Sequence, residues 1–268
     1  MKKWQVVLSL TIFLVALVAI LCWTWNLQHT KNMSICLLKQ RNKKDSLYVV
    51  INLDRRPDRL EHCRKELAFL PAPFTRLSAV DGQKKPNVDS SELITTYDTT
   101  VNHRWDKAIP PHESREMSPG EIGCCMSHIR ALRLSQRHAK HPLVVFEDDV
   151  VVFDPKRLLN IQSYIPDDAD LFYFGYIDVG GIDHTQANVH GISPVKFCFG
   201  MFSYMILKPE KLLAMLPMSS PVDLWYGELI ESGKIKAYAA SPKICDQIAY
   251  GCNSDITHTG FGDAPRKC

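Results

Sequence analysis

The sequence has little excess charge, no C-x-x-C cysteine pair, no internal repeat and no low-complexity tract. Its 32 basic and 29 acidic residues leave a net charge of +3. Nucleic-acid-binding domains usually carry a marked basic excess, so we expect no nucleic-acid partner. The nine cysteines lack the paired spacing of a zinc site. With 13 glycines and 16 prolines in 268 residues, a collagen-like chain is excluded. The length allows one full domain and something extra.

The amino terminus carries a long apolar run. Val6 to Trp25 contains about twenty apolar or weakly polar residues, enough to cross a bilayer as a helix, and tryptophans flank it at both ends. The alternative is a cleaved signal peptide, which has a shorter apolar core and a small-residue cleavage site. We therefore predict a cytoplasmic tail and transmembrane anchor over residues 1–25 and a polar stem over 26–45.

The charges beside this run allow two orientations. Five lysines and arginines follow it by residue 44, whereas Lys2 and Lys3 precede it. Taken literally, the positive-inside rule would keep the large domain in the cytosol. A short tail before one large domain instead suits a type II signal anchor, and long domains translocate largely regardless of charge. The chemistry of the domain, given below, favours the second orientation.

Strand and helix patterns alternate after the stem. Leu47–Leu53 is typical of a strand buried on both faces. Ser118 and Glu121 have the capping-box spacing that begins a helix. Residues 83–116 are polar and weakly patterned, which predicts an extended, partly mobile insertion. Further strands are predicted at Leu143–Phe146 and Leu171–Phe174, and helices at Pro209–Leu216 and Leu224–Glu231. The alternation predicts one α/β domain over 46–268, built on a mostly parallel sheet.

Three adjacent carboxylates interrupt an apolar run. Glu147, Asp148 and Asp149 lie between Leu143–Phe146 and Val150–Phe153. Charges at the edge of a buried strand are costly unless they are paired or bind a cation. In a near-extended chain Glu147 and Asp149 point the same way, and their oxygens suit Mg²⁺ or Mn²⁺. The alternative is a turn whose acids are solvated or paired with arginine.

Short motifs occur in order over nearly the whole domain. They are Tyr48–Arg59 (YVVINLDRRPDR), Ala79–Gly82 (AVDG), Gly120–His128 (GEIGCCMSH), the acidic run at 147–149, Pro221–Asp223 (PVD) and Ser254–Ile256 (SDI). Singly the short ones are weak. Together they resemble glycosyltransferase family 25, which includes bacterial lipooligosaccharide galactosyltransferases and animal procollagen galactosyltransferases.

The resemblance implies a GT-A-like nucleotide-sugar transferase domain that uses a UDP-sugar and Mn²⁺ and inverts the anomeric configuration. It places the metal on Asp149, gives Glu147 a contact with the metal or the ribose, leaves Asp148 to orient the site, and makes Asp223 the base for the acceptor hydroxyl. The residues that we assign to the donor, through its diphosphate, its uridine or another contact, are Arg55, Arg56, Arg59, Asp81, Ser127 and His128.

Structural alternatives remain for these residues. Asp223 would also serve as the N-cap of a helix beginning at Leu224. The three arginines also suit an exposed helix start, and Asp81 suits an ordinary Asp-Gly turn. His128 also suits a packed, hydrogen-bonded core histidine. Among the ten histidines, His258 is a further metal candidate.

We therefore predict a metal-dependent inverting glycosyltransferase that moves a hexose, with galactose favoured, from a UDP-sugar to a hydroxyl of a glycan or glycoprotein. We expect a type II membrane protein of the Golgi or endoplasmic reticulum with a lumenal catalytic domain. In an oxidising lumen Cys245 and Cys252 are a conceivable disulfide pair. The alternative function is a catalytically inactive family member that binds ligands or mediates adhesion, and the intact acids count against it. A metal-dependent hydrolase would need a water-activating constellation that the sequence does not reveal.

Overall fold

The computed structural model describes residues 46–105, 107 and 109–248. The chain divides into two units, Met1–Lys43 and Lys44–Cys268, and every described residue lies in the second. Within the described part, no helix is both long and apolar enough to cross a bilayer. The predicted anchor and stem lie outside the described residues, and so does His258, the further metal candidate. These three stay predictions.

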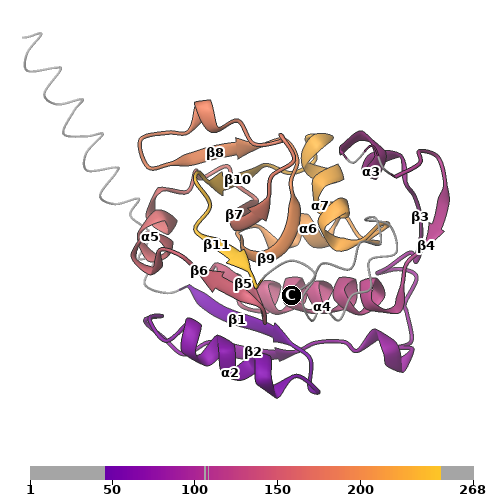
Figure 1. Ribbon diagram of the computed structural model, residues 1–268, viewed down its shortest axis with the longest axis horizontal. Helices are drawn as coiled ribbons and strands as arrows, with labels where there is room; N and C mark the ends of the chain where they lie inside the picture. Colours follow the sequence, from indigo (N-terminus) through magenta and orange to yellow (C-terminus); the bar gives the residue numbers. More distant parts are fainter. Residues whose placement is uncertain (1–45, 106, 108, 249–268) are drawn as a thin grey trace, which may run out of the picture. The chain divides into compact units, whose positions relative to one another are not determined.

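A nine-stranded sheet forms the centre of the domain (Figure 1). Its strands are β1 (Leu47–Asn52), β2 (Thr75–Ser78), β5 (Leu143–Glu147), β6 (Val150–Val152), β7 (Leu171–Ile177), β8 (Ile192–Val195), β9 (Phe199–Ile206), β10 (Ala237–Ala240) and β11 (Cys245–Gln247). The main path is β2-β1-β5-β9-β7-β10-β8, and β11 joins β6 to β7. On this path β2, β1, β5, β7 and β10 run one way, whereas β9 and β8 run the other. The predicted mostly parallel sheet is confirmed, with an antiparallel strand inserted at its middle.

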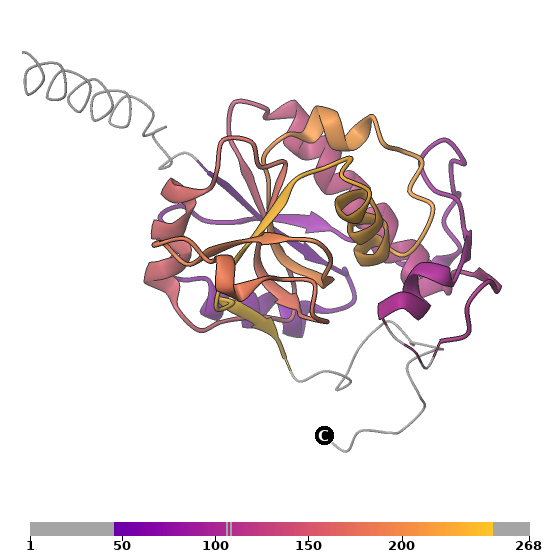
Figure 2. The same cartoon turned by 90° about the horizontal axis from the view of Figure 1, so that it is seen from above.

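Helices cover both faces of this sheet, as Figure 2 shows. They are α2 (Pro57–Glu66), α4 (Pro119–Arg137), α5 (Pro155–Ile161), α6 (Pro209–Leu213) and α7 (Val222–Glu231), whereas α3 (Thr100–Trp105) packs on α7. Successive residues of a strand point to opposite faces. Accordingly Val145 belongs to a core with α4, α6 and α7, while Phe146 belongs to a second core with α2 and α5. The result is a three-layer sandwich.

The segment 83–116 is more ordered than its sequence suggested. Its described residues form α3 and a two-stranded antiparallel sheet of β3 (Thr96–Asp98) and β4 (Ser114–Glu116). Leu93 and Tyr97 from this segment are buried in the core with α4 and α7. The prediction of an extended insertion is wrong. The apolar side chains that anchor this segment are isolated in the sequence, so they give no helix or strand periodicity, yet they pack on a core built by distant residues.

The first turns of α4 pack directly on the turn after β2. A Cβ atom on Gly123 would lie 2.5 Å from the Val80 carbonyl oxygen, so only glycine allows this approach. One turn later the Ser127 hydroxyl accepts a 2.8 Å hydrogen bond from the Val80 N–H and donates one of 2.6 Å to the Gly123 carbonyl. The predicted capping box of Ser118 and Glu121 is confirmed at the start of the same helix. Gly123 and Ser127 of the GEIGCCMSH motif thus hold α4 against the carboxyl end of β2.

Replacing Gly123 by alanine is expected to destabilise the protein by about 1–3 kcal/mol, because the new methyl group overpacks a backbone contact. In an uncrowded helix the same change would stabilise by about 0.5–1 kcal/mol, so the sign of the effect tests the contact. Urea unfolding gives the measurement. Arg137→Ala, at an exposed position in the last turn of α4, is the control and should stay within about 0.5 kcal/mol of the wild type.

Candidate active site

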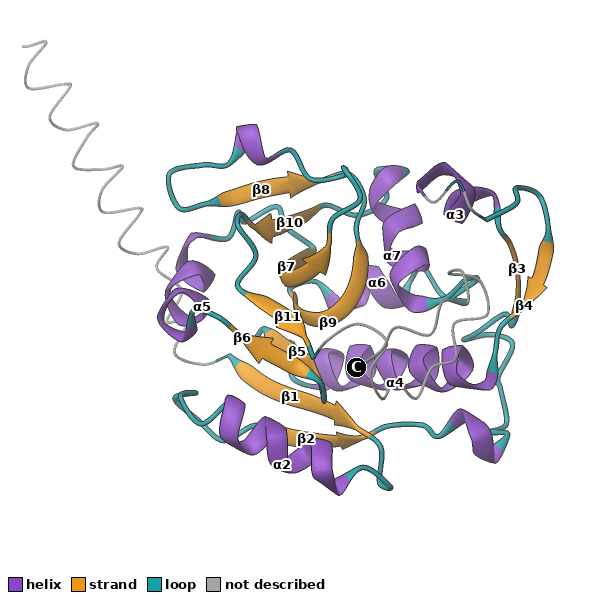
Figure 3. Ribbon diagram, in the orientation of Figure 1, coloured by secondary structure: helices purple, strands orange, loops and turns teal. Residues whose placement is uncertain are grey.

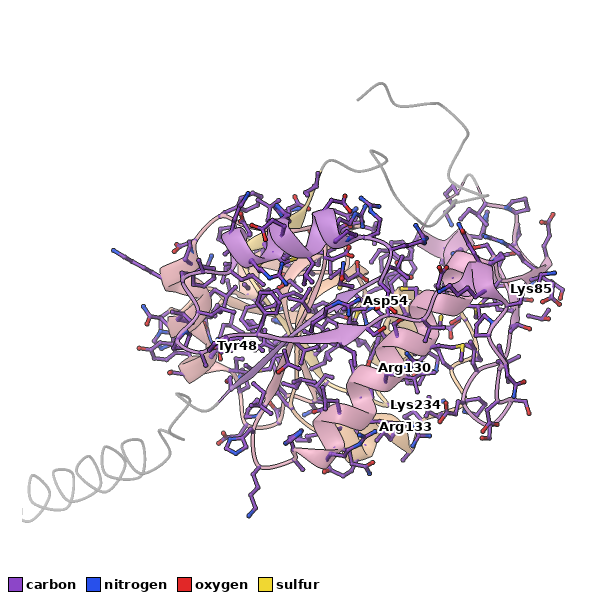
Figure 4. All side chains as sticks on the ribbon, turned by 90° about the horizontal axis from the view of Figure 1, so that it is seen from below. Tyr48, Asp54, Lys85, Arg130, Arg133 and Lys234 are labelled. Atoms are coloured by element: carbon purple, nitrogen blue, oxygen red, sulfur yellow. The ribbon has the colours of Figure 1, made fainter. Side chains whose placement is uncertain are left out.

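The acidic run forms a turn at the carboxyl end of β5. Glu147 ends the strand, Asp148 and Asp149 form the turn, and β6 begins at Val150. Because β1, β2 and β5 are parallel, their carboxyl ends meet at one edge of the sheet (Figure 3). Figure 4 labels Asp54 just beyond the end of β1 at this edge. The extended geometry expected through the acids is wrong, since the backbone turns between them.

Asp148 is fixed by the protein on both oxygens. Arg59 Nη1 donates to Oδ1 over 2.8 Å, and Asn52 Nδ2 donates to Oδ2 over 2.8 Å. Burial raises the pKa of Asp148, and these two donors oppose that rise. The arrangement suits the orienting role predicted for Asp148. Sequence reasoning missed Asn52, although an amide in an otherwise apolar buried strand was a signal.

Asp149 is largely buried, and one of its oxygens has no hydrogen-bond partner among the described residues. That atom is Oδ1, while Oδ2 lies 3.6 Å from Arg59 Nη1. Burial and then the nearby charge of Glu147 raise the pKa of Asp149 to about 7. A covered carboxylate beside a second negative charge is a setting that a bound cation would relieve.

Glu147 points to α4, where it meets a histidine. His128 Nε2 lies 3.0 Å from Glu147 Oε1, and His128 Nδ1 lies 2.8 Å from the Tyr204 hydroxyl of β9. His128 is 1% exposed, so it is a packed, hydrogen-bonded histidine that also reaches the acidic turn. Cys124 lies one helical turn earlier. One ligand atom from each of Cys124, His128 and Glu147 lies within 4.8 Å of the others. Sequence reasoning missed Cys124 and Tyr204, which the tertiary fold brings here.

The remaining predicted donor residues at this edge all contact protein groups. Arg55 Nε lies 3.2 Å from Asp81 Oδ2, and Asp81 also caps a 3-10 turn by accepting from the Gln83 N–H. Arg56 pairs with Asp58 at 2.8 Å, and this pairing lowers the pKa of Asp58 to about 2. The structure brings Arg55 and Asp81 together, and their contacts to a donor stay predictions.

Asp223 is the second residue of α7, in the first turn of the helix. Pro221 occupies the N-cap position, so the N-cap alternative for Asp223 is wrong. The Leu224 N–H donates to Oδ1 at 2.9 Å, and the Gly200 N–H donates to Oδ2 at 3.5 Å. Burial raises the pKa of Cys124 well above its usual value, and Glu147 and Asp223 both add to that rise. Cys124 is therefore within electrostatic reach of both carboxylates.

The carboxylates of this site fit a hard divalent cation. Glu147 and Asp149 offer oxygen ligands of the kind that Mg²⁺ and Mn²⁺ take. Two observations support the fit: Asp149 Oδ1 has no hydrogen-bond partner in the described ranges, and the two acids repel each other. Such an ion would lie at the carboxyl end of β5, where open α/β sheets bind ligands.

Three sequence relatives cover most of this chain. A glycosyltransferase 25 family member of Drosophila pseudoobscura pseudoobscura is 29% identical over 75% of this chain and 32% of its own length. Procollagen galactosyltransferase 1 of Danio rerio is 26% identical over 67% of this chain and 31% of its own. Procollagen galactosyltransferase 2 of Homo sapiens is 26% identical over 72% of this chain and 33% of its own length. The chain thus spans about a third of the length of these curated relatives.

A solved structure and a family profile complete the comparison. The crystal structure of A197 from STIV aligns with 74% of this chain and 82% of its own, at a TM-score of 0.37 and 14% identity. Residues 46–208 match the profile described as glycosyltransferase family 25 (LPS biosynthesis protein). This segment holds the acidic turn and the helix that contacts it. The chain belongs to glycosyltransferase family 25.

Proposed function

We propose that this protein is a metal-dependent inverting glycosyltransferase that moves a hexose, galactose in the first instance, from a UDP-sugar to a hydroxyl of a glycan or glycoprotein. The observation that carries the proposal is the buried Asp149 Oδ1 near Glu147 at the carboxyl end of β5, which has no hydrogen-bond partner within the part of the chain that the structure describes. The galactosyltransferase names of two relatives support galactose. Because this chain spans only about a third of the length of those relatives, they leave the acceptor open.

The protein groups have separate tasks in this proposal. Asp149 and Glu147 would hold the divalent cation, which when bound neutralises charge on the departing diphosphate. His128 orients the Glu147 carboxylate through its 3.0 Å contact, and Tyr204 fixes the imidazole. Arg59 pairs with the acidic turn and so limits the repulsion between its carboxylates.

Asp223 would take the proton from the acceptor hydroxyl. Inversion requires a base on the face opposite the leaving group. The backbone N–H groups of Leu224 and Gly200 fix the Asp223 carboxylate at the start of α7. These two backbone contacts support the choice of Asp223 as the base.

Replacing Asp223 by asparagine is expected to lower kcat about 10²- to 10⁴-fold, because the amide cannot accept the proton. The affinity for UDP and Mn²⁺, measured by calorimetry, should stay unchanged. Glu210→Gln, at an exposed acid on α6, is the matched control and should keep the wild-type rate. An unchanged kcat in Asp223→Asn would remove Asp223 from the reaction.

The activity itself is tested with the purified full-length chain, Mn²⁺ and a panel of UDP-sugars. We expect release of UDP from one donor, with transfer to a glycan acceptor followed by mass spectrometry. Nucleotide binding without turnover would favour the inactive, ligand-binding alternative. The proposed lumenal, type II placement is tested separately by protease protection of the domain in sealed microsomes.

A further inference from the structure

A cluster of three potential metal ligands lies beside the acidic turn and consists of Cys124, His128 and Glu147. Cys124 has no task in the proposed transfer reaction. Cys124 and His128 are four residues apart on α4, so they share one face of the helix. Glu147 meets this face from the end of β5, and its Oε1 lies 3.0 Å from His128 Nε2. One ligand atom of each residue lies within 4.8 Å of the others. Helix α4 and strand β5 therefore bring three different types of metal ligand close together.

A thiol sulfur, an imidazole nitrogen and a carboxylate oxygen suit a borderline transition metal better than Mg²⁺ or Mn²⁺. In a tetrahedral zinc site, bonds of about 2.0–2.1 Å to nitrogen and oxygen place those two atoms about 3.3 Å apart. The observed separation of 3.0 Å between His128 Nε2 and Glu147 Oε1 is close to this value. Three protein ligands would leave a fourth position open to water.

Tyr204 supplies the outer contact that such a site needs. A metal-binding histidine usually engages an oxygen through its second ring nitrogen, and His128 Nδ1 lies 2.8 Å from the Tyr204 hydroxyl. His128 and Tyr204 are both buried, so packing fixes the ring. The Glu147 side chain is 26% exposed, which leaves an approach from solvent.

We propose that Cys124, His128 and Glu147 bind a thiophilic divalent transition metal such as Zn²⁺. Binding replaces the thiol proton of Cys124, which passes to solvent. Glu147 would then be shared with the hard cation of the transfer site, so Zn²⁺ would displace Mn²⁺ and inhibit transfer. The zinc site stands by itself, and the inhibition rests on the proposed function.

Cobalt titration of the reduced full-length protein tests the sulfur ligand. Thiolate-bound Co²⁺ gives a charge-transfer band in the near ultraviolet, which we expect in the wild type and not in Cys124→Ser. The control is Cys125→Ser, whose wild-type thiol donates to the Ser220 carbonyl at 3.8 Å, and it should keep the band. Absence of the band in the wild type, or its survival in Cys124→Ser, would overturn the site.

A second variant keeps the test decisive if Cys124→Ser does not fold. Tyr204→Phe leaves all three ligands in place, and we expect it to weaken Zn²⁺ binding about 10- to 100-fold through the loss of the outer contact. Calorimetry with Zn²⁺ measures the shift, and circular dichroism checks the fold. An unchanged zinc affinity in a folded Tyr204→Phe protein would contradict binding through His128 in this orientation.

Electron paramagnetic resonance of Mn²⁺ separates this inference from the proposed function. If Glu147 is shared, Zn²⁺ should release bound Mn²⁺ one for one, and simultaneous binding would overturn the sharing. Asp149→Asn should lose Mn²⁺ and keep the cobalt band. Loss of turnover with an intact cobalt band would count against the transferase alone, whereas turnover without any band would count against the zinc site alone.

Discussion

Replacing Asp149 by asparagine is expected to abolish sugar transfer and, at the same time, to stabilise the metal-free protein above pH 7. The loss of a charged ligand to the cation should lower the rate at least about 10²- to 10³-fold, as removal of a single electrostatic stabiliser does. The gain in stability arises because the amide carries no charge, whereas the wild-type carboxylate is largely buried and is repelled by the nearby charge of Glu147.

The pH dependence of unfolding follows from the raised pKa. In the unfolded chain Asp149 ionises near pH 4, whereas its pKa in the folded protein is about 7. Its contribution to stability is therefore present at low pH and is lost as the pH rises through 7. Without metal, the wild type should be less stable at pH 8 than at pH 5, and Asp149→Asn should reduce this difference.

Urea unfolding with a chelator at pH 5 and pH 8 provides the measurement. Excess Mn²⁺ at pH 8 should restore stability to the wild type and leave Asp149→Asn unchanged, because binding stabilises only a folded state that retains the site. Asp89→Asn, at an exposed loop acid, is the matched control and should behave as the wild type. Greater stability of the wild type at pH 8 than at pH 5 without metal would contradict this account of Asp149.

Replacing Arg59 by methionine is expected to cost about 3–5 kcal/mol at pH 8, because it leaves the buried charge of Asp148 without its ion partner. Both side chains are nearly covered, at 13% and 10% exposure, and Nη1 lies 2.8 Å from Oδ1. The same guanidinium lies 3.6 Å from Asp149. The cost should be smaller at pH 5, where Asp149 is protonated.

Arg64→Met is the matched control, on the same helix but with a side chain that is 59% exposed. Its ion pair with Glu61 is at the surface, so we expect a change within about 1 kcal/mol. Urea unfolding of both variants at the two pH values gives the change in the free energy of unfolding. The comparison separates the loss of the buried ion pair from the effect of replacing arginine by methionine in this helix. Equal effects of Arg59→Met and Arg64→Met would mean that the acidic turn does not depend on Arg59.

The parts of the site that could be predicted from the sequence depend on neighbours along the chain. The buried strand before Glu147 and the capping box at Ser118 follow from local apolar runs and from short-range hydrogen bonds. The acids were recognisable because charges are rare within such runs. The family motifs likewise placed Gly123 and Ser127, although their structural task became clear only from the contact with the turn after β2.

The sequence by itself determined the α/β class, the position of the acids at the end of a strand and the family, because each rests on patterns of nearby residues. The tertiary structure alone decided that Asn52 and Arg59 hold Asp148, across 96 and 89 residues, and that Tyr204 of an antiparallel central strand meets His128 across 76. Such contacts depend on the order in which strands assemble. That order is set by the packing of the whole sheet against its helices, which no local pattern records.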